Sequence, residues 1–266
     1  MKDKKIEKLI KEEMSRQADM LNLIASENYA SSDVLEALGS ILVNKYAEGY
    51  PAFRYYGGNE FIDKIEQLTQ ARALKLFNLS IKEWSVNVQP YSGSPANLAI
   101  YLALVPPGEK IMGMKLDMGG HLTHGHRVSA TGKFWHQVPY GVNSVSEVLD
   151  YDELSKIAHQ EKPKMIVAGF TAYSRVIDFK KFRKIADEIG AVLMVDMSHF
   201  AGLVAGRAYS SPFPYADVVM TTGHKTLRGP RAALIFSRKQ YSEKIDKAVF
   251  PGLQGGPHVN QIAAIA

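Results

Sequence analysis

A single lysine, Lys225, lies among hydroxyl groups and positive charge in the segment Thr221-Thr222-Gly223-His224-Lys225-Thr226-Leu227-Arg228-Gly229-Pro230-Arg231. The segment follows an apolar run, 218–220, that is typical of a buried strand. Burial and nearby positive charge both lower the pKa of a lysine. Such a lysine is a nucleophilic amine, able to form a Schiff base with a carbonyl compound such as pyridoxal phosphate. From this segment alone, an ordinary surface lysine in a polar loop is the simpler interpretation.

A second candidate is Asp196, which follows five apolar residues, 191–195, and precedes His199 by three positions. This pattern predicts a buried parallel strand with an acid at its carboxyl end, where open α/β sheets bind their ligands. A pyridoxal cofactor needs a carboxylate that keeps its pyridine nitrogen protonated. An aspartate after a strand also commonly caps the next helix. The sequence leaves both interpretations open.

The third feature is Ser92-Gly93-Ser94, which precedes the apolar stretch 98–104. Small residues and hydroxyls at the start of a helix suit a phosphate, because the first backbone N–H groups are free and the helix dipole is positive there. Many turns have the same composition, so this signal alone is weak. A phosphate cradle, a strand-end acid and a strand-end lysine, in that order along the chain, are together much more specific.

Three histidines, His121, His124 and His126, have a spacing that could ligate a metal, with Asp117 nearby. Glycine-flanked imidazoles equally suit ring stacking and loop hydrogen bonds. Short motifs of this kind often mislead. We therefore predict no metal site.

The pattern of apolar residues divides the first 77 residues into three stretches. Residues 4–20 carry apolar side chains at helical spacing, and we expect this helix to pack on a partner or on the main body. Residues 21–58 are predicted to be irregular and to form a binding element. Residues 60–77 return to helical spacing. We divide the chain into an N-terminal segment, 1–58, for the active site and dimer interface, and a large cofactor-binding domain, 59–266.

From residue 85 onward, strand-like and helix-like stretches alternate, which predicts an α/β fold of three layers with a mostly parallel sheet. The strand-like runs are 110–114, 165–168, 192–195, 218–221 and 233–236, and helix-like stretches include 151–159 and 179–189. The last residues, 259–266, are typical of a helix that is just starting and has no capping residue. We therefore expect the sequence to be part of a longer chain.

The composition is ordinary for a globular protein, with 46% hydrophobic and 22% charged residues. No apolar stretch approaches the roughly 20 residues that span a bilayer, and the charged N-terminus does not resemble a signal peptide. The absence of cysteine excludes disulfides and thiolate catalysis. The net charge of +5 comes without a nucleic-acid-binding motif. We expect a cytoplasmic protein that binds neither nucleic acid nor membranes.

These motifs together resemble the serine hydroxymethyltransferase family, which uses pyridoxal phosphate and has the aspartate-aminotransferase fold (fold type I). The resemblance spans nearly the whole chain and is carried, in family order, by 24–28, 44–58, 92–97, 119–125, 195–199, 224–231 and 251–258. It implies the reversible transfer of the hydroxymethyl carbon of serine to tetrahydrofolate, which gives glycine and 5,10-methylenetetrahydrofolate.

The resemblance also implies roles for individual residues around the cofactor. Lys225 would hold it covalently, Asp196 would pair with its ring nitrogen and His121 would stack over its ring. Glu48 would be the main acid/base group, with Tyr55 and Tyr56 beside it. Further cofactor contacts would come from Ser92, Gly93, Ser94, Thr171, His199, Thr222 and His224, and from Tyr46, Gly255 and Gly256 of a second subunit.

On the substrate side, the resemblance implies that Ser26 and Arg231 contact the amino acid, and that Leu116, Gly120 and Leu122 line the folate site. Shared sites of this kind require at least a homodimer. A missing smaller C-terminal domain would carry the arginine that clamps the substrate carboxylate. Two alternatives remain: a folate-independent aldolase for β-hydroxy amino acids, and a non-catalytic partner that binds the cofactor or supports dimerisation.

The chain departs from the usual pattern of the family at a few positions inside these motifs. Gly223 replaces a threonine, Thr171 a serine, Ser198 an alanine and Ala232 a glycine. These changes leave the predicted lysine, aspartate, histidine and glutamate in place.

Overall fold

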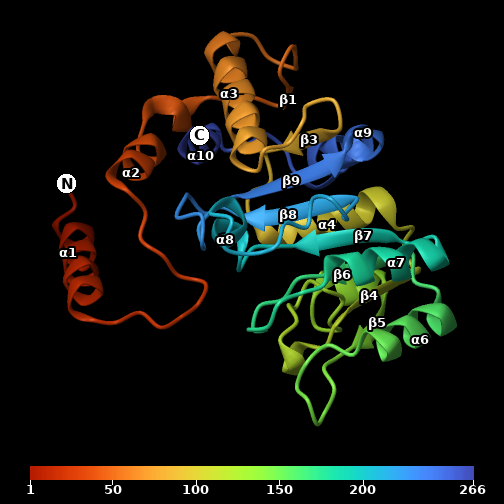
Figure 1. Cartoon of the computed structure of the whole chain (residues 1–266). Coiled ribbons are helices and arrows are strands. Elements are labelled where there is room, and N and C mark those ends of the chain that lie inside the picture. The colour runs from red at the N-terminus through yellow and green to blue at the C-terminus, as the bar shows by residue number, and fades with distance from the viewer.

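The computed structural model describes all 266 residues and is built on a seven-stranded sheet with the order β3-β9-β8-β7-β6-β4-β5 (Figure 1). The strands are β3 (Trp84–Asn87), β4 (Lys110–Met114), β5 (His136–Tyr140), β6 (Met165–Ala168), β7 (Val192–Asp196), β8 (Val218–Thr222) and β9 (Ala233–Arg238). The pairs from β5 to β8 are parallel, and β9 runs antiparallel to both β8 and β3. The predicted α/β fold with a mostly parallel sheet is confirmed.

Helices cover both faces of this sheet, which gives the three expected layers. One apolar core packs α4 and α9 against the sheet, and the other packs α3, α6, α7, α8 and α10 against the opposite face. None of the helices combines the length and the apolar composition that a membrane-spanning segment requires. The helices on the sheet are α3 (Glu60–Leu76), α4 (Gly93–Leu104), α6 (Tyr151–Glu161), α7 (Phe179–Ile189), α8 (Ala201–Ala205), α9 (Lys239–Lys247) and α10 (Val259–Ile265), and a short α5 (Ala130–Phe134) precedes β5.

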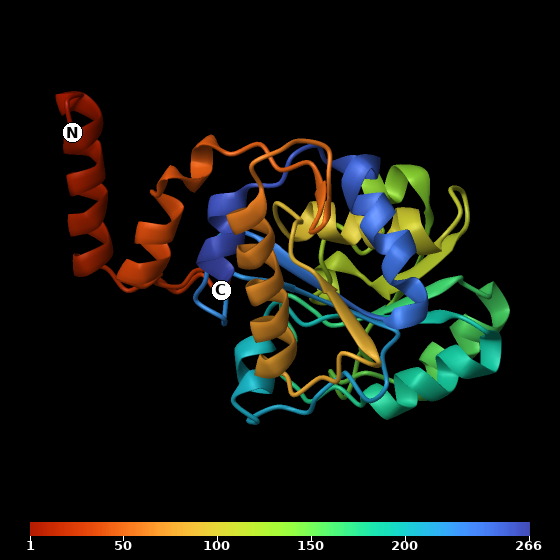
Figure 2. The ribbon, with the colours of Figure 1, turned by 90° about the horizontal axis from the view of Figure 1, so that it is seen from above.

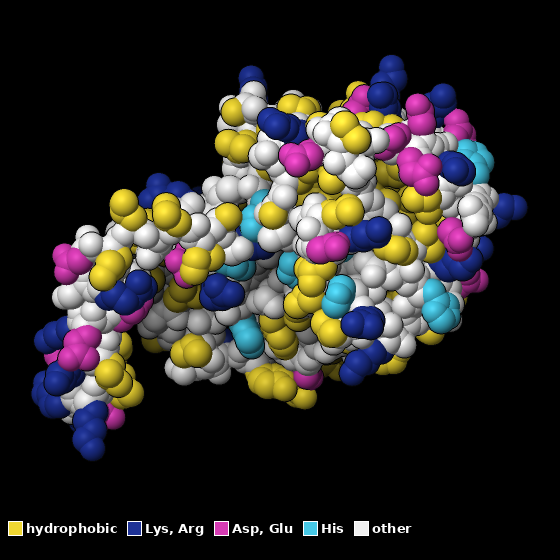
Figure 3. All heavy atoms as spheres, turned by 90° about the horizontal axis from the view of Figure 1, so that it is seen from below, with side chains coloured by type: hydrophobic (Ala, Val, Ile, Leu, Met, Phe, Trp, Pro, Cys, Tyr) yellow, Lys and Arg dark blue, Asp and Glu magenta, His cyan; other side chains and the backbone are white.

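The N-terminal part contributes nothing to the large sheet. It contains α1 (Lys4–Asp19), α2 (Ser32–Leu38), the short helix η1 (Ile41–Asn44) and a hairpin of β1 (Gly49–Tyr50) and β2 (Phe53–Arg54). Helix α1 lies apart from the body and buries no residue, so its apolar face has no partner within this chain (Figure 2). Figure 3 shows the same segment as an arm with hydrophobic side chains on its surface.

The prediction that residues 21–58 are irregular is wrong for part of this region, because α2 and the hairpin are regular. Ser31 caps α2 by accepting a hydrogen bond from the backbone N–H of Val34. At its other end, the carbonyl of Leu38 accepts a bond from Asn260 Nδ2, at the far end of the sequence, over 2.9 Å. A helix of seven residues is marginal by itself, and this distant contact stabilises it.

The sheet brings the candidate active-site residues together at the carboxyl ends of its parallel strands. Asp196, the last residue of β7, pairs in register with Met220 on the parallel strand β8, so that both strands end side by side. The loop after β8 carries Lys225, and the N-terminus of α4 packs against the same strand end. This is the carboxyl edge at which parallel sheets bind ligands.

The segment that carries His121 depends on a glycine pair. Gly119 has a φ of 105°, and its carbonyl accepts a hydrogen bond from the Thr171 backbone over 2.8 Å. A methyl group at Gly120 would lie 2.1 Å from the backbone oxygen of Met114. Glycine at this position therefore lets the His121 loop close against β4.

Gly120→Ala is expected to lower the free energy of unfolding by about 3 kcal/mol, because the added methyl group has no space against the backbone. Urea unfolding followed by circular dichroism measures the loss. Gly57→Ala is the matched control, since no heavy atom lies within 4 Å of the methyl group it would add. Equal stability of the two variants would contradict this explanation.

Candidate active site

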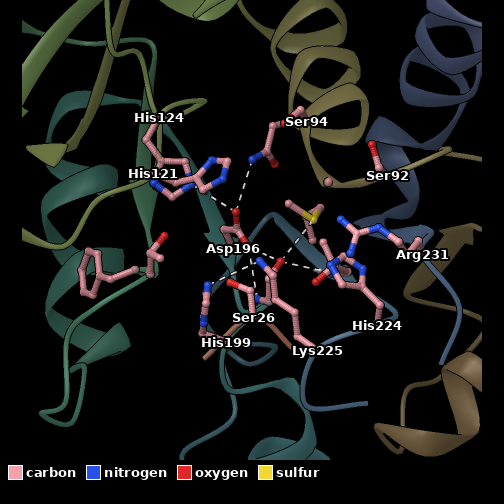
Figure 4. A pocket seen from close by; sticks show the side chains of 17 residues that line it. Ser26, Ser92, Ser94, His121, His124, Asp196, His199, His224, Lys225 and Arg231 are labelled. Atoms are coloured by element: carbon pink, nitrogen blue, oxygen red, sulfur yellow. Dashed lines mark hydrogen bonds and ion pairs between the residues drawn. The ribbon is translucent and has the colours of Figure 1, made fainter. Parts of the chain in front are cut away.

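A cavity of about 260 Å³ lies at the carboxyl edge of β7 and β8, beside the N-terminus of α4 (Figure 4). Seventeen residues line it. Twelve of them were predicted from the sequence: Ser26, Ser92, Gly93, Ser94, His121, Thr171, Asp196, His199, Thr222, His224, Lys225 and Arg231. Five were not assigned a role: Asn97, His124, Phe170, Ser198 and Met220.

Asp196 lies at the centre of the site and is buried (Figure 4). Its Oδ1 accepts hydrogen bonds from the backbone N–H and the hydroxyl of Ser198, and its Oδ2 lies 3.1 Å from His124 Nε2. Burial raises the pKa of this carboxyl group, but the hydrogen bonds from His124 and Ser198 outweigh burial and hold the pKa below its usual range. The carboxylate is therefore ionised.

The alternative that Asp196 caps the next helix is wrong. The next helix, α8, begins at Ala201, and its N-terminal capping position is Phe200. The side chain of Asp196 instead bonds to the residue two positions further on, in a local turn. Its function is thus not explained by helix capping.

Two partners of this carboxylate are not predicted by the sequence motifs. Asn97 lies in α4, one turn after Gly93, and its Nδ2 lies 3.2 Å from Asp196 Oδ2. His124 is 1% exposed and follows His121 by three positions. The signal for Asn97 was its position on the same helix face as Gly93, and the signal for His124 was the His-x-x-His spacing, which was considered only for a metal.

Lys225 is half-buried, so the simple surface-lysine interpretation is wrong. Its Nζ lies 3.4 Å from His199 Nε2, and Asn28 donates a hydrogen bond to its backbone carbonyl over 2.9 Å. Burial lowers the pKa of the Lys225 ammonium group; Asp196 opposes this shift, whereas Arg231 reinforces it. At a given pH, a larger fraction of this amine is therefore neutral than in a free lysine, and the neutral amine is the nucleophilic form.

The two histidines around this lysine are neutral at pH 7. Burial, reinforced by Lys225, lowers the pKa of His199 to about 4. Burial, reinforced by Arg231 and Lys225, lowers the pKa of His224 to about 4 as well. A neutral imidazole beside the amine can accept a hydrogen bond from it.

These shifts predict a loss of stability on acidification. The unfolded chain binds the two protons near the ordinary histidine pKa of 6.5, whereas the folded chain binds them only near 4. The free energy of unfolding is therefore expected to fall between these pH values and to level off below them, by roughly 1 kcal/mol for each histidine after allowance for its exposure. Urea unfolding across this range should show a smaller loss in His199→Gln than in His136→Gln, a control at an exposed position. The same loss in both variants would contradict the assignment.

The N-terminus of α4 is suited to an anion. No side chain caps it, so the first backbone N–H groups remain free to bind a ligand. A methyl group at Gly93 would lie 2.8 Å from Thr222 Cγ2, so glycine lets the helix end approach β8 closely. His224 and Arg231 line the same cavity and add donors and positive charge. Together they form an anion-binding corner.

His121 completes the wall opposite Lys225 (Figure 4). Its Nδ1 lies 2.7 Å from the Thr123 hydroxyl, and its ring centroid lies 5.6 Å from that of His124. Burial lowers the pKa of His121, so it also presents a neutral ring. No group of three or more histidine, cysteine or acidic side chains that could hold a metal ion occurs in the structure.

Six predicted site residues lie outside the cavity and form a second group, the hairpin cluster: Tyr46, Glu48, Tyr55, Tyr56, Gly255 and Gly256. The Tyr46 and Tyr56 rings meet edge to face at 5.7 Å. A methyl group at Gly255 would lie 3.3 Å from Glu48 Oε1, so the two segments adjoin. The nearby Glu48 carboxylate raises the pKa of Tyr46.

The three residues predicted to line a folate site also lie outside the cavity lining. Leu116 and Leu122 are 40% and 41% exposed, whereas Gly120 is buried between them. All three flank the loop of His121, so they lie next to the cavity in the chain.

Comparison with known proteins agrees with this geometry. A family model described as "Serine hydroxymethyltransferase" matches residues 1–266. The chain is 58% identical over 264 residues to a serine hydroxymethyltransferase of Desulfotalea psychrophila, covering 99% of this chain and 61% of the relative. It is 56% identical over 265 residues to that of Metamycoplasma arthritidis, covering 99% and 62% of the two chains.

The chain thus spans about three fifths of the length of the curated relatives it matches. Over that span the match is continuous and includes both the cavity and the hairpin cluster. The chain belongs to the serine hydroxymethyltransferase family.

Proposed function

We propose that the protein transfers the hydroxymethyl carbon of serine to tetrahydrofolate, with pyridoxal phosphate as cofactor, and produces glycine and 5,10-methylenetetrahydrofolate. One observation carries the proposal: a lysine with a lowered pKa, a buried ionised aspartate and an uncapped helix N-terminus meet in one cavity. Membership of the family supports the same reaction.

The residues of the cavity fit this cofactor. Among the residues that line the cavity, four buried polar atoms have no hydrogen-bond partner within the chain: Asn97 Oδ1, His124 Nδ1, Thr222 Oγ1 and His224 Nδ1. Thr222 and His224 belong to the anion-binding corner. The phosphate would be held at the N-terminus of α4 by Ser92, Gly93 and Ser94, and Thr171 would lie beside the ring. Lys225 would bond to the aldehyde carbon, and Asp196 would pair with the ring nitrogen. When bound, the cofactor supplies an electron sink for the bonds at Cα of the amino acid.

The chain's own residues would then control position and protons. Asp196 would keep the ring nitrogen of the cofactor protonated, because its carboxylate remains ionised. His121 forms a neutral flat surface against which a ring can stack, and His199 can accept a hydrogen bond from the Lys225 amine and so orient it. Ser26 and Arg231 line the cavity where the substrate carboxylate would lie. These placements support binding of serine or glycine beside the lysine.

The hairpin cluster suggests that two copies of the chain share their sites. Glu48 is the predicted acid/base group, yet it lies outside the cavity of its own chain. A homodimer in which each hairpin cluster faces the other subunit's cavity would bring Glu48, Tyr55 and Tyr56 to the substrate hydroxyl and Tyr46, Gly255 and Gly256 to the phosphate. We therefore include a homo-oligomer, at least a dimer, in the proposal.

An activity assay tests the reaction. The protein that carries this sequence, loaded with pyridoxal phosphate, is expected to form glycine from serine rapidly only when tetrahydrofolate is present. Folate-independent cleavage of β-hydroxy amino acids at a comparable rate would favour an aldolase instead. Binding of the cofactor without turnover of either substrate would favour a non-catalytic partner.

Mixing two inactive variants tests the shared site. In a hybrid dimer of Lys225→Ala and Glu48→Gln, one site carries both substitutions and the other carries neither. Random mixing makes half of the dimers hybrids, so about one quarter of wild-type activity is expected to return. No recovery, with hybrid formation shown by mass spectrometry, would mean that both groups act from one chain.

Three further expectations remain predictions from the sequence. They are the folate contacts of Leu116, Gly120 and Leu122, the domain boundary between residues 58 and 59, and a cytoplasmic location. Cell fractionation would check the location.

A further inference from the structure

Ser198 bridges the two strands that carry the candidate catalytic groups. It is 3% exposed and lies two residues after the end of β7. Its hydroxyl donates to Asp196 Oδ1 over 2.6 Å and accepts a hydrogen bond from the Thr222 backbone N–H over 3.1 Å. A single buried hydroxyl thus joins the carboxylate on one strand to the end of the next.

The position of Thr222 explains why this contact is needed. The backbone bonds between β7 and β8 end where Met197 N donates to Met220 O, because β7 stops at Asp196. The next N–H of β8 that points toward β7, that of Thr222, has no strand residue to receive it. The Ser198 hydroxyl takes the place of the missing backbone acceptor, and a buried N–H without an acceptor would be costly.

The direction of both bonds is fixed by chemistry. A backbone N–H can only donate, so the Ser198 oxygen must accept from Thr222. The hydroxyl has one proton, and the ionised carboxylate is a better acceptor than Met220 Sδ, which lies 3.7 Å away. Oδ1 of Asp196 is therefore occupied by Ser198, through the backbone as well as the hydroxyl.

We propose that Ser198 is a positioning residue: its hydroxyl connects the Thr222 amide to Asp196 and fixes the orientation of the carboxylate relative to the loop that carries Lys225. With Oδ1 held by Ser198 and Oδ2 held by His124 and Asn97, the carboxylate is fixed in one orientation. The role toward the cofactor rests on the proposed function, whereas the link between the two strands does not.

Hydrogen exchange tests the link without cofactor. In Ser198→Ala, the Thr222 amide is expected to exchange about tenfold faster than in wild type, whereas Ser198→Thr, which keeps the hydroxyl, restores slow exchange. Ser237→Ala is the matched control, because Ser237 is a buried serine on the neighbouring strand β9 that makes no hydrogen bond to Asp196. Unchanged exchange at Thr222 in Ser198→Ala would overturn the proposal.

A pH titration tests the effect on the carboxylate. Loss of a hydrogen bond to the ionised carboxylate makes Asp196 easier to protonate. On acidification, Ser198→Ala is therefore expected to release bound pyridoxal phosphate at a higher pH than wild type. It is also expected to bind pyridoxal phosphate about tenfold more weakly. A purely structural role would lower stability without moving this pH midpoint, and that result would also overturn the proposal. Should Ser198→Ala fail to fold, Ser198→Cys keeps the volume with a weak donor and has the same expected directions. If wild type itself binds no pyridoxal phosphate while the Thr222 difference remains, the proposed function fails and the strand link stands.

Discussion

Lys225→Ala is expected to abolish covalent attachment of pyridoxal phosphate and to lower the turnover of serine by roughly 10⁴-fold or more, the scale seen when a covalent nucleophile is removed. The reason is geometric as well as chemical: Lys225 supplies the amine in a cavity that no other lysine lines. The visible absorption spectrum of the purified protein with cofactor, together with the rate of glycine formation, measures both losses.

Lys225→Arg separates the amine from its charge. Arginine retains the positive charge but remains protonated and is not a nucleophile. We expect Lys225→Arg to be as inactive as Lys225→Ala, but still to bind pyridoxal phosphate non-covalently through the anion-binding corner. An arginine variant that keeps substantial activity would show that Lys225 acts only as a cation.

Asp196→Asn is expected to have the second largest effect, a loss of turnover on the order of 10³-fold, the scale of removing a preorganised electrostatic partner. An amide cannot hold a ring nitrogen in its protonated form. Its NH₂ group would also face donors, because His124, Asn97 and Ser198 now surround a carboxylate. Steady-state kinetics and the affinity for pyridoxal phosphate measure the effect.

A second aspartate in the same sheet provides the control. Asp217 precedes β8 at the opposite edge, where its Oδ2 accepts hydrogen bonds from Arg183 and from the backbone of Leu193 over 2.7 and 2.8 Å. Asp217→Asn is expected to lower stability and to leave turnover per folded molecule unchanged. Comparable losses of turnover in both variants would mean that Asp196 acts only through the fold.

The sequence predicts the buried strands of the sheet well because their apolar runs are continuous. The bounds of β4 and β6 are as predicted, and β7, β8 and β9 extend by one or two residues. The edge strands β3 and β5 were not predicted. Strand β5, with the sequence HQVPY, contains Pro139 and polar residues that only an edge position tolerates, so its pattern does not indicate a strand.

The site could be predicted only as far as local motifs reach. Residue type and position at the end of a strand or helix are enough to identify Asp196, Lys225 and Ser92–Ser94 in the sequence. Asn97 and His124 become recognisable only when α4 and the His121 loop converge on one carboxylate, which is a tertiary event. The separation of the hairpin cluster from the cavity is likewise not visible in a linear sequence.

The bond from Asn28 to the backbone of Lys225 has a consequence for the order in which the protein matures. The two residues are 197 positions apart, and Arg228 makes a similar contact with Tyr29 across 199 positions. During synthesis the segment with Asn28 and Tyr29 therefore leaves the ribosome long before the loop with Lys225 and Arg228 exists, and contacts of such long range form late. The lysine loop gains its final shape only after most of the chain has been made, so a nascent chain cannot capture the cofactor early.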